Sequence, residues 1–252
     1  MQFLILHYYN DKMNERTDLI INKQEREIIN KTLFVITGLG GVGGTALEVI
    51  LRFGALNYYL IDGDIFEESN LNRQILSKRD NIGRLKTEVG EKHIRDLSPN
   101  SKIKICSEMI KAENIEKIYK DIKEFYKDNV LEKIVLLDCI DDVRAKIILY
   151  KAFLDTDSII VSSMGAGRNF SAPLVASSLD KTHSCPLARE VRYEARKNLD
   201  EQELKRIKAV FSPVPVTCKE KNGIIPSSVI QTFNTGVRVA EEALRALLDI
   251  NN

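Results

Sequence analysis

Short apolar runs alternate along the chain with longer segments in which apolar residues recur at helical spacing. Residues 32–37, 58–61 and 134–137 are rich in apolar and β-branched side chains, the composition of buried parallel strands. Segments 45–53 and 143–153 follow two of these runs and show the alternation of apolar and polar residues found in helices. The pattern predicts an α/β fold of the Rossmann-like type, a doubly wound, mostly parallel sheet with helices on both faces.

The second half of the chain continues this pattern. Residues 158–161 form another strand-like run, and segment 235–250 has an apolar helix face that we expect to pack on the core or on a partner subunit. That face consists of Val237, Ala240, Leu244, Leu247 and Leu248. Because no linker rich in Gly, Ser or Pro divides the chain, we predict a single domain over residues 1–252 that begins with a short helical arm over 1–30.

A glycine-rich turn follows the first predicted strand directly. It has the pattern G-x-G-x-x-G, and its glycines are Gly38, Gly40, Gly41 and Gly43. The turn leads into the predicted helix 45–53, so it lies where free backbone N–H groups and the helix dipole attract phosphate. Glycine at these positions also lets a ligand approach the backbone closely. We therefore expect nucleotide phosphates at this turn.

Acidic and cationic residues follow the second predicted strand. Asp62 and Asp64 come about 20 positions after the glycines, where a carboxylate accepts hydrogen bonds from a ribose. An NAD-dependent dehydrogenase fits equally well up to this point. The continuation contains Asn70, Arg73 and Lys86 in the motifs SNLNRQ and GRLK. Hydride transfer needs no such cluster, whereas cleavage of a triphosphate uses fixed cations to stabilise charge that moves among phosphate oxygens.

Taken singly, these two cations would be ordinary solvated residues. Their position after a strand, a glycine turn and an acidic pair predicts instead that they belong to a site that cleaves ATP. The run 134–137 ends in DCIDD, at the strand end where open α/β sheets bind ligands, although one of its three aspartates is expected to cap the next helix. The first half, 31–160, is thus the predicted nucleotide-binding half.

The segments GLGGVGG, LIDGDIFEESNLNRQ, IGRLK and LLDCIDD resemble the ThiF/MoeB-type adenylating domain of the ubiquitin-activating-enzyme superfamily. The resemblance implies that the cofactors are ATP and Mg²⁺ and that Gly41 lies against the phosphates. It also implies that Asp62 binds the ribose and that Asp141 holds the magnesium ion. Phosphate contacts are implied for Asn70, Arg73 and Lys86, while Gly38, Gly40, Gly43 and Asp64 complete the expected ATP site.

The four cysteines narrow the choice within this superfamily. They lack any C-x-x-C pair, whereas many activators of sulfur-carrier proteins bind zinc through two such pairs. Cys106 and Cys139 lie in or beside apolar runs and are interpreted as small core residues. Cys185 and Cys218 lie in polar or Pro-bearing segments, where a reactive thiol stays an open alternative.

The second half resembles the tRNA threonylcarbamoyladenosine dehydratases, a branch of the same superfamily. The resemblance rests on SSMGAGR at 162–168, on KTHSCPLAREVR, on AVFS, and on ERTDLI near the N-terminus. It implies that ATP adenylates the threonyl carboxylate of N6-threonylcarbamoyladenosine at position 37 of tRNA. The carbamoyl group then closes a ring, AMP leaves, and the net change is loss of water. Residues 161–252 are thus the predicted substrate-side half.

Two other functions stay open at this point. One is adenylation of the C-terminal glycine of a sulfur-carrier or ubiquitin-like protein, and the other is a nucleotide-binding scaffold without catalysis. Of two departures from the branch pattern, the first bears on metal affinity and the second on the geometry of the substrate end. Asp142 stands where Asn, Ser or Ala is usual, and no Glu follows Ser212.

The resemblance also implies catalytic and partner-binding residues. Arg73, Lys86 and magnesium on Asp141 are expected to stabilise the charge formed during adenylation. Arg16 is expected to reach the nucleotide of the other subunit of a homodimer, its alternative being an exposed helix residue. For tRNA, the basic segment 181–208 is the expected contact. Arg189, Arg192 and Arg196 recur there at helical spacing, although interleaved glutamates also fit a solvated helix face.

Composition adds an expected location. Hydrophobic residues make up 44% of the chain and charged residues 29%, with a net charge of +1, so there is no general signature of nucleic-acid binding. The apolar stretches are shorter than the roughly 20 residues that span a bilayer, and the N-terminus does not resemble a secretory signal. We therefore expect a cytoplasmic protein without a membrane span.

Overall fold

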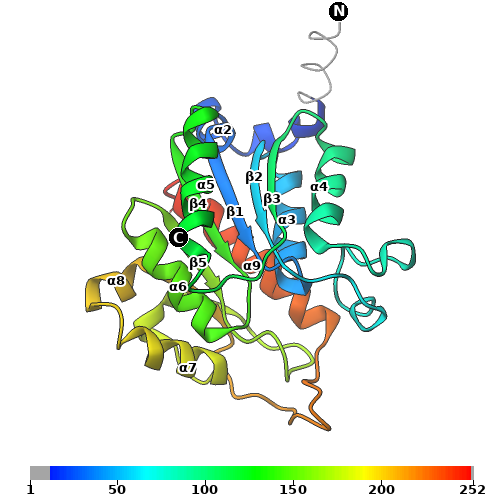
Figure 1. The fold of residues 1–252 in the computed structure, drawn as a ribbon, viewed down its shortest axis with the longest axis vertical. Coiled ribbons are helices and arrows are strands. Elements are labelled where there is room, and N and C mark those ends of the chain that lie inside the picture. The colour runs from blue at the N-terminus through cyan, green and yellow to red at the C-terminus, as the bar shows by residue number, and fades with distance from the viewer. Residues whose placement is uncertain (1–11, 251–252) are drawn as a thin grey trace, which may run out of the picture.

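A seven-stranded sheet forms the centre of the computed structural model, which describes residues 12–250 (Figure 1). The strand order is β3-β2-β1-β4-β5-β7-β6, and every neighbouring pair is parallel except β6 and β7, which are antiparallel. The strands are β1 (Thr32–Thr37), β2 (Asn57–Ile61), β3 (Lys102–Cys106), β4 (Lys133–Asp138), β5 (Ile159–Ser163), β6 (Val175–Ser178) and β7 (Ile207–Phe211). The predicted Rossmann-like, mostly parallel sheet is therefore confirmed.

Helices cover both faces of this sheet (Figure 1). They are α2 (Lys23–Asn30), α3 (Gly41–Arg52), α4 (Lys86–Leu97), α5 (Ile115–Asp128), α6 (Val143–Leu154), α7 (Pro186–Ala195), α8 (Glu201–Arg206) and α9 (Val229–Leu247). Single 3-10 turns occur at η1 (Thr17–Leu19), η2 (Glu68–Asn70), η3 (Arg79–Asn81) and η4 (Leu179–Lys181). Strands from the second half, β6 and β7, join the same sheet as those of the first half.

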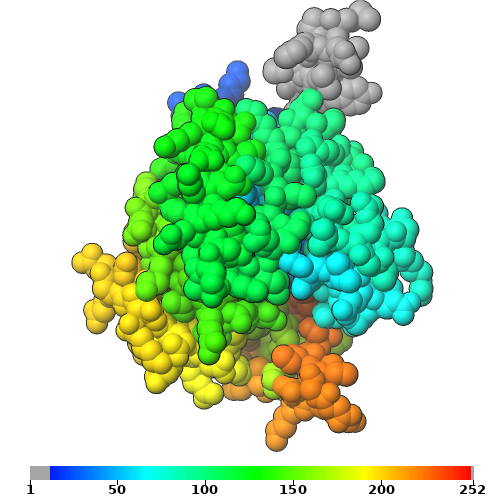
Figure 2. Space-filling model, in the orientation of Figure 1, coloured from blue at the N-terminus to red at the C-terminus, as the bar shows by residue number. Residues whose placement is uncertain are grey.

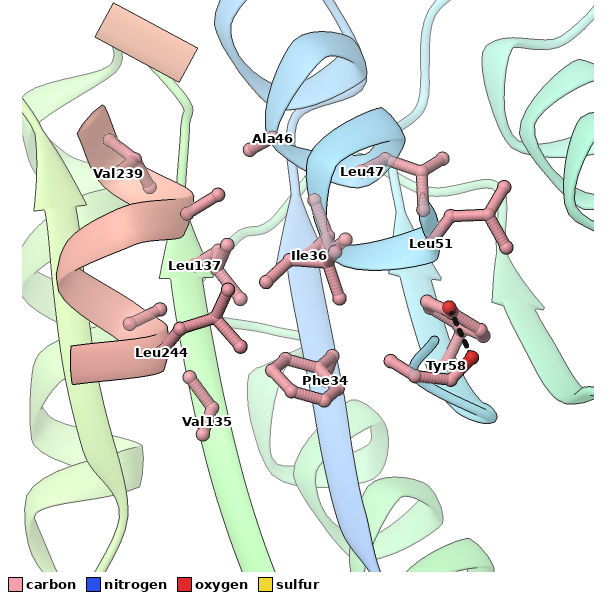
Figure 3. Packing of buried hydrophobic residues seen from close by; sticks show 14 of the residues in the cluster. Phe34, Ile36, Ala46, Leu47, Leu51, Tyr58, Val135, Leu137, Val239 and Leu244 are labelled. Carbon is pink, nitrogen blue, oxygen red and sulfur yellow. Dashed lines mark hydrogen bonds between the residues drawn. The ribbon is translucent and has the colours of Figure 1, made fainter. Parts of the chain in front are cut away.

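The strand residues alternate between two hydrophobic cores. Phe34 and Ile36 of β1 face α3 and α9, and Figure 3 shows Leu47 of α3 and Leu244 of α9 on this side of the sheet. The intervening residues of β1 belong to the second core, which includes buried residues of α5, α6 and α7. Since both faces are covered, the parallel strands read as continuous apolar runs rather than as an alternating pattern.

Two helices begin earlier than their sequence pattern predicts. Helix α3 begins at Gly41 rather than at residue 45, because close neighbours fix the low-propensity glycines in its first turn. Helix α9 begins at Val229, where Ser228 caps it by accepting a hydrogen bond from the backbone N–H of Ile230. The apolar face expected for α9 is mostly buried, but Val237 is 45% exposed and does not pack on the core.

The described part of the N-terminal arm lies at the amino ends of the strands. Helix α2 leads directly into β1, and Arg26 of α2 donates a hydrogen bond to the carbonyl of Phe53, beyond the end of α3. In Figure 1 this region is at the top, while the carboxyl ends of the parallel strands point downward. The arm and the glycine turn thus lie at opposite ends of β1.

Among the helices of residues 12–250, none is both long enough and apolar enough to cross a lipid bilayer. The boundaries expected for the arm and the two halves stay predictions, as does the cytoplasmic location.

Candidate nucleotide site

Close backbone packing shapes the glycine turn. Gly38 has a φ of +79°, which favours glycine, and a Cβ there would lie 2.9 Å from the carbonyl oxygen of Cys139. A Cβ on Gly43 would lie only 1.7 Å from the carbonyl oxygen of Gly38. Gly40 differs, because its nearest neighbour would be the amide of Gln74 at 3.7 Å. The turn is therefore tight on its inner side and leaves the first N–H groups of α3 at the carboxyl edge of the sheet.

Helix α9 supports the turn from the far end of the chain. A Cβ on Gly41 would lie 2.2 Å from the methyl carbon of Thr232, and one on Gly236 would lie 2.5 Å from the carbonyl oxygen of Val42. The two glycines let α3 and α9 approach closely. Motif reasoning did not predict Thr232 at this site, because only the tertiary contact between the two helices places it there.

Asp62 is bonded to the glycine turn at the end of β2. Its Oδ2 atom accepts a hydrogen bond from the backbone N–H of Leu39 at 2.6 Å, and its Oδ1 atom accepts one from that of Asp64 at 2.8 Å. The residue is 8% exposed. Burial raises the pKa of this carboxyl group, while Lys86 and the two backbone donors lower it in part. The structure thus places the predicted ribose-binding residue beside the predicted phosphate turn.

Lys86 lies at the first position of α4 and is 7% exposed. Its ammonium group lies 2.9 Å from the Oδ2 atom of Asp64 and 4.0 Å from that of Asp62. The backbone N–H of Lys86 also donates to the carbonyl of Asp64, at 3.0 Å. The two predicted acids and the predicted lysine therefore form one cluster, in which the positive charge offsets the buried Asp62 carboxylate and pairs with the exposed Asp64.

The backbone of the segment that contains Asn70 and Arg73 passes beside the glycine turn. The carbonyl oxygen of Arg73 would lie 3.0 Å from a Cβ on Gly41, so the chain passes directly beside the glycines. The Arg73 guanidinium group donates to the carbonyl of Ser69 at 2.8 Å, and Asn70 is buried. Gln74, which is 8% exposed, has a buried Oε1 atom with no partner among the described residues. Its amide group therefore keeps bonding capacity beside Gly40.

The three aspartates at the end of β4 and in the following loop differ in burial and in hydrogen bonding. Asp138 is buried, and Asp142 caps α6 by accepting a hydrogen bond from the backbone N–H of Ala145 at 2.7 Å. The unusual Asp142 is thus accounted for as a helix cap. Asp141 is exposed, and its carboxylate has no hydrogen bond or ion pair with residues 12–250. Ile140 packs against Gly38, which brings Asp141 to the side of the phosphate turn.

This arrangement fits magnesium held jointly by the protein and a nucleotide. Mg²⁺ commonly binds through one or two carboxylates together with substrate phosphates. Asp141 offers one exposed carboxylate in the loop whose Ile140 packs against the turn, and no group of three His, Cys, Asp or Glu in the described part of the chain forms a metal site of its own. The described residues therefore do not form a metal site that is complete without a bound nucleotide.

Residues after β3, which the motifs did not identify, cover the Asp62 side of the site. A Cβ on Gly63 would lie 2.6 Å from the backbone nitrogen of Met109, and the Ser107 hydroxyl lies 2.6 Å from that of Thr87. A hollow of about 470 Å³ lies between β3 and α5, and its lining includes Cys106, Ser107 and Asp121. The only sequence signal for this segment was its position after a strand at the ligand-binding edge.

Arg16 lies far from the site in its own chain. It is exposed and directly precedes η1, at the amino ends of the strands, whereas the glycine turn lies at their carboxyl ends. The six residues of β1 alone separate these ends by roughly 20 Å. Arg16 therefore does not contribute to the nucleotide site of its own subunit in this arrangement.

Of the three predicted tRNA-binding arginines, Arg189 and Arg192 lie on α7 and Arg196 directly follows it, and they differ in exposure. Arg192 donates to the carbonyl and hydroxyl oxygens of Thr182, both at 2.6 Å. Burial lowers the pKa of Arg192, and the charges of Arg196 and Arg189 lower it further. Those two arginines are exposed, and neither guanidinium forms a hydrogen bond or ion pair with described residues. Tyr193, between them, is 64% exposed.

The cysteines show no group prepared for nucleophilic attack. Cys106 and Cys139 pack against the two cores, as predicted, and burial raises the pKa of both thiols. Cys185 is buried, and its Sγ atom accepts a hydrogen bond from the backbone N–H of Gly165 at 3.4 Å. Cys218 is exposed in the segment between β7 and α9, which Figure 2 shows in orange at the lower edge of the molecule.

The segment between β7 and α9 is tied to the loop after β5. The backbone N–H of Arg168 donates to the carbonyl of Pro226 at 2.7 Å, and the N–H groups of Thr217 and Cys218 both donate to the carbonyl of Arg168. Arg168 itself has a φ of +67°. These two predicted substrate-side segments therefore form one surface at the carboxyl edge of the sheet, beside the nucleotide site.

A family model and several curated proteins are similar to this chain. The model of the ThiF family matches residues 13–252. A tRNA threonylcarbamoyladenosine dehydratase of Bacillus subtilis is 29% identical over 81% of this chain and 76% of its own length. The Haemophilus influenzae protein of the same name is 31% identical over 72% of this chain and 67% of its own length.

A solved structure gives the same picture for the fold. The Escherichia coli tRNA N6-threonylcarbamoyladenosine dehydratase in complex with AMP has a TM-score of 0.84 and 24% identity, with 95% of each chain covered. The same arrangement of sheet and helices therefore binds an adenine nucleotide in that protein.

Proposed function

The chain belongs to the ThiF family, and from that membership we propose that it catalyses the ATP-dependent dehydration of N6-threonylcarbamoyladenosine at position 37 of tRNA. The observation that carries this proposal is the similarity to the Bacillus subtilis dehydratase over 81% of the chain, which extends beyond the nucleotide-binding half. The reaction has two steps, adenylation and then cyclisation, and in the second the modification itself supplies the nucleophile.

The first step is adenylation of the threonyl carboxylate. The glycine turn and the N-terminus of α3 bind the phosphates of ATP, while Asp62 accepts hydrogen bonds from the ribose. Arg73 and Lys86 stabilise the charge that develops as the carboxylate attacks the α-phosphate and pyrophosphate leaves. Asp141 holds Mg²⁺, which supplies further positive charge to the phosphate oxygens when bound.

Ring closure completes the reaction without an enzyme nucleophile. The carbamoyl group attacks the activated carbonyl of the same molecule, and the carbonyl–oxygen bond to AMP breaks. Holding both groups in one site replaces a bimolecular reaction with an intramolecular one. Cys139 and Cys185 agree with this route, because Cys185 is buried and desolvation raises the pKa of the Cys139 thiol.

The active protein is a homodimer in this proposal, and Arg16 reaches the nucleotide of the partner subunit. Support comes from the arm, where Leu19 and Ile20 are 86% and 83% exposed. Two adjacent apolar side chains at such exposure fit an arm that packs against a second copy. The position of Arg16 at the amino ends of the strands, away from the glycine turn of its own chain, supports an intermolecular role in this proposal.

The tRNA substrate binds along the exposed face of α7. Arg189 and Arg196 offer two guanidinium groups without protein partners among the described residues, and Tyr193 lies between them. Such a combination suits phosphate contacts together with stacking on an unpaired base. Arg192 has a different part in this proposal, because its bonds to Thr182 fix the loop that precedes α7.

Mass spectrometry of the modified nucleoside tests the proposal directly. The protein is incubated with ATP, Mg²⁺ and tRNA from cells that lack the activity, and we expect threonylcarbamoyladenosine to lose the mass of water. Omission of ATP and the variant Asp141→Ala serve as controls. ATP–pyrophosphate exchange with a sulfur-carrier protein, and none with this tRNA, would instead support the protein-adenylating function. ATP binding without AMP formation on either substrate would indicate a non-catalytic scaffold.

A further inference from the structure

A buried polar network links the carboxyl ends of β4 and β5, and the reaction described above makes no use of it. Its centre is Lys146 of α6, which is fully buried, as is Asp138 at the end of β4. The Lys146 ammonium group lies 2.8 Å from the Oδ2 atom of Asp138. An ion pair without solvent contact is costly to desolvate, and apolar residues of similar size often replace such pairs without loss of stability. Stability alone therefore does not explain why this ion pair is present.

All three protons of the Lys146 ammonium group have an acceptor. Besides Asp138, they reach the hydroxyl oxygen of Ser162 at 3.1 Å and the backbone carbonyl of Ser163 at 2.8 Å. An ammonium group has three donors, so this lysine has no bonding capacity left for a ligand. Lys146 is thus fixed in one position and connects the last residue of β4 with the last two residues of β5.

Asp138 is held from several sides as well. Its Oδ2 atom accepts hydrogen bonds from the Ser162 hydroxyl at 2.6 Å and from the Tyr150 hydroxyl at 3.1 Å. Burial raises the pKa of the Tyr150 hydroxyl, and the charge of Asp138 raises it further, so that Tyr150 stays a donor. The other carboxylate oxygen, Oδ1, accepts a weaker hydrogen bond from the backbone N–H of Ile140 at 3.4 Å.

The bond to Ile140 connects the network to the nucleotide site. Ile140 lies between Asp138 and Asp141, and its side chain packs against Gly38 of the phosphate turn. The backbone N–H of Cys139 also donates to the carbonyl of Thr37, the last residue of β1. The course of residues 139–141 is therefore fixed on one side by β1 and the glycine turn, and on the other by the Asp138 carboxylate.

From these contacts we infer that Lys146 is a positioning residue, which acts through Asp138 to hold the loop 139–141 and thereby sets the place of Asp141 beside the phosphate turn. The inference rests on the proposed function only in taking Asp141 as the magnesium ligand. Lys146 does not touch the nucleotide. Its ammonium group holds the Asp138 carboxylate in place, and the carboxylate in turn orients the loop.

The double variant Asp138→Asn with Lys146→Met tests the inference, because it removes both charges and leaves no unpaired ion in the core. Hydrogen exchange of the amides in 139–142 is measured without any ligand. We expect exchange there to become at least tenfold faster, while amides in 42–47 of α3 keep the protection of the wild type. A matched control, Ile29→Val in the core near the arm, reports the effect of a general loss of stability.

A second measurement concerns magnesium. Calorimetric titration with a non-hydrolysable ATP analogue is carried out over a range of Mg²⁺ concentrations, and AMP is titrated without the metal. We expect the double variant to need at least tenfold more Mg²⁺ for half of the gain in analogue affinity, with AMP affinity within threefold of the wild type. Neither readout depends on tRNA, so a wild-type protein inactive on tRNA would overturn the proposed function alone.

Unchanged exchange in 139–142 together with unchanged Mg²⁺ dependence would overturn the inference, even if the double variant were less stable. If the double variant does not fold, Ser162→Ala serves in its place, because it removes one partner and leaves the charges paired. There we expect two- to fivefold effects in the same direction. Wild-type behaviour of Ser162→Ala would overturn the inference equally.

Discussion

The carboxylate of Asp62 accepts a hydrogen bond from the backbone N–H of Leu39 at 2.6 Å. Asp62 directly follows β2, and Leu39 lies inside the glycine turn that follows β1. This bond joins the residue proposed for the ribose to the turn proposed for the phosphates. The spacing between the two parts of the nucleotide site is therefore fixed by the protein before any ligand binds.

Replacement of Asp62 by alanine is expected to weaken ATP binding. The change removes both the proposed ribose acceptor and the support of the turn at Leu39, and a hydrogen bond to a charged group contributes about 1.5–3 kcal/mol. We expect the Kd for ATP to rise roughly 10- to 100-fold, since 1.4 kcal/mol corresponds to about tenfold. Isothermal titration calorimetry measures it. The exposed Asp96→Ala is the control, and equal affinities for both variants would argue against the role of Asp62.

Alanine at Gly43 and at Gly40 should have very different effects on stability. A Cβ at Gly43 would meet the carbonyl oxygen of Gly38 at 1.7 Å, whereas one at Gly40 would meet only the Gln74 side chain at 3.7 Å. Backbone must move in the first case, at a cost of about 3–5 kcal/mol. Calorimetric scans should therefore show Gly43→Ala melting roughly 6–20 °C below Gly40→Ala. Equal melting temperatures would contradict the tight turn.

Asp141→Ala should strongly reduce AMP formation without unfolding the protein. The side chain is exposed and makes no bond with described residues, so its loss leaves the fold unchanged. Loss of one charge-stabilising group lowers turnover by roughly 100- to 1,000-fold. The rate of AMP release with modified tRNA measures the effect, and Asp142→Asn, which keeps a capping oxygen at α6, is the matched control. Comparable loss in both variants would remove the distinction between the two aspartates.

Arg189→Ala and Arg196→Ala should weaken tRNA binding and lower its salt dependence. Each phosphate contact contributes roughly 0.7–0.9 to the slope of log K against log salt concentration, so the double variant should lose between about 1 and 2 from that slope. Filter binding at several salt concentrations gives the slope. The control is Lys23→Ala, an exposed cation at the start of α2 and away from α7. An unchanged slope for the arginine variant would place the tRNA elsewhere.

Acid should weaken a contact between α3 and α4. Hydrogen bonds with His93 and Arg52 lower the pKa of Glu48 from 4.5 to about 2. A lowered carboxyl pKa stabilises the fold at pH values above 4.5, and the contribution is lost as the pH falls from there toward 2. Because the side chain is 16% exposed, we expect about 1–2 kcal/mol.

Chemical unfolding at pH 6 and at pH 3 measures this effect. Glu48→Gln should lower the free energy of unfolding at pH 6 and have less effect at pH 3, where the wild type has begun to lose the same contribution. Glu113→Gln, at an exposed position, is the control for removal of a surface carboxylate. A Glu48→Gln effect that does not diminish in acid would show that packing, not charge, is responsible.

The sequence was informative wherever one local segment contains the whole signal. The strand over 32–37 coincides with β1, and the helix over 143–153 differs from α6 by one residue at its end. Strong local patterns of this kind reflect burial on both faces of a parallel sheet, which leaves few polar positions in a strand. The glycine turn, Asp62 and Lys86 were found together for a similar reason, because they belong to consecutive connections at one edge of the sheet.

The sequence pattern was less informative where a residue could have more than one role. The spacing of Arg189, Arg192 and Arg196 placed them on one helix face, but only the fold shows that Arg192 is bonded to Thr182. The DCIDD motif likewise contains a capping, a buried and an exposed aspartate. Which residue caps depends on where α6 begins, and the spacing of apolar residues alone does not fix a helix end to one residue.

By itself, then, the sequence indicated the strands around 32–37, 58–61, 134–137 and 158–161, the phosphate turn, and the acids and cations that follow it, because backbone geometry ties each to its neighbours. The tertiary structure alone decided that Thr232 of α9 supports Gly41, that Lys146 joins β4 to β5, and that Arg16 lies at the opposite end of the sheet. Periodicity shows which face of an element is buried. It does not show which distant residues cover that face, since this follows from packing the whole chain.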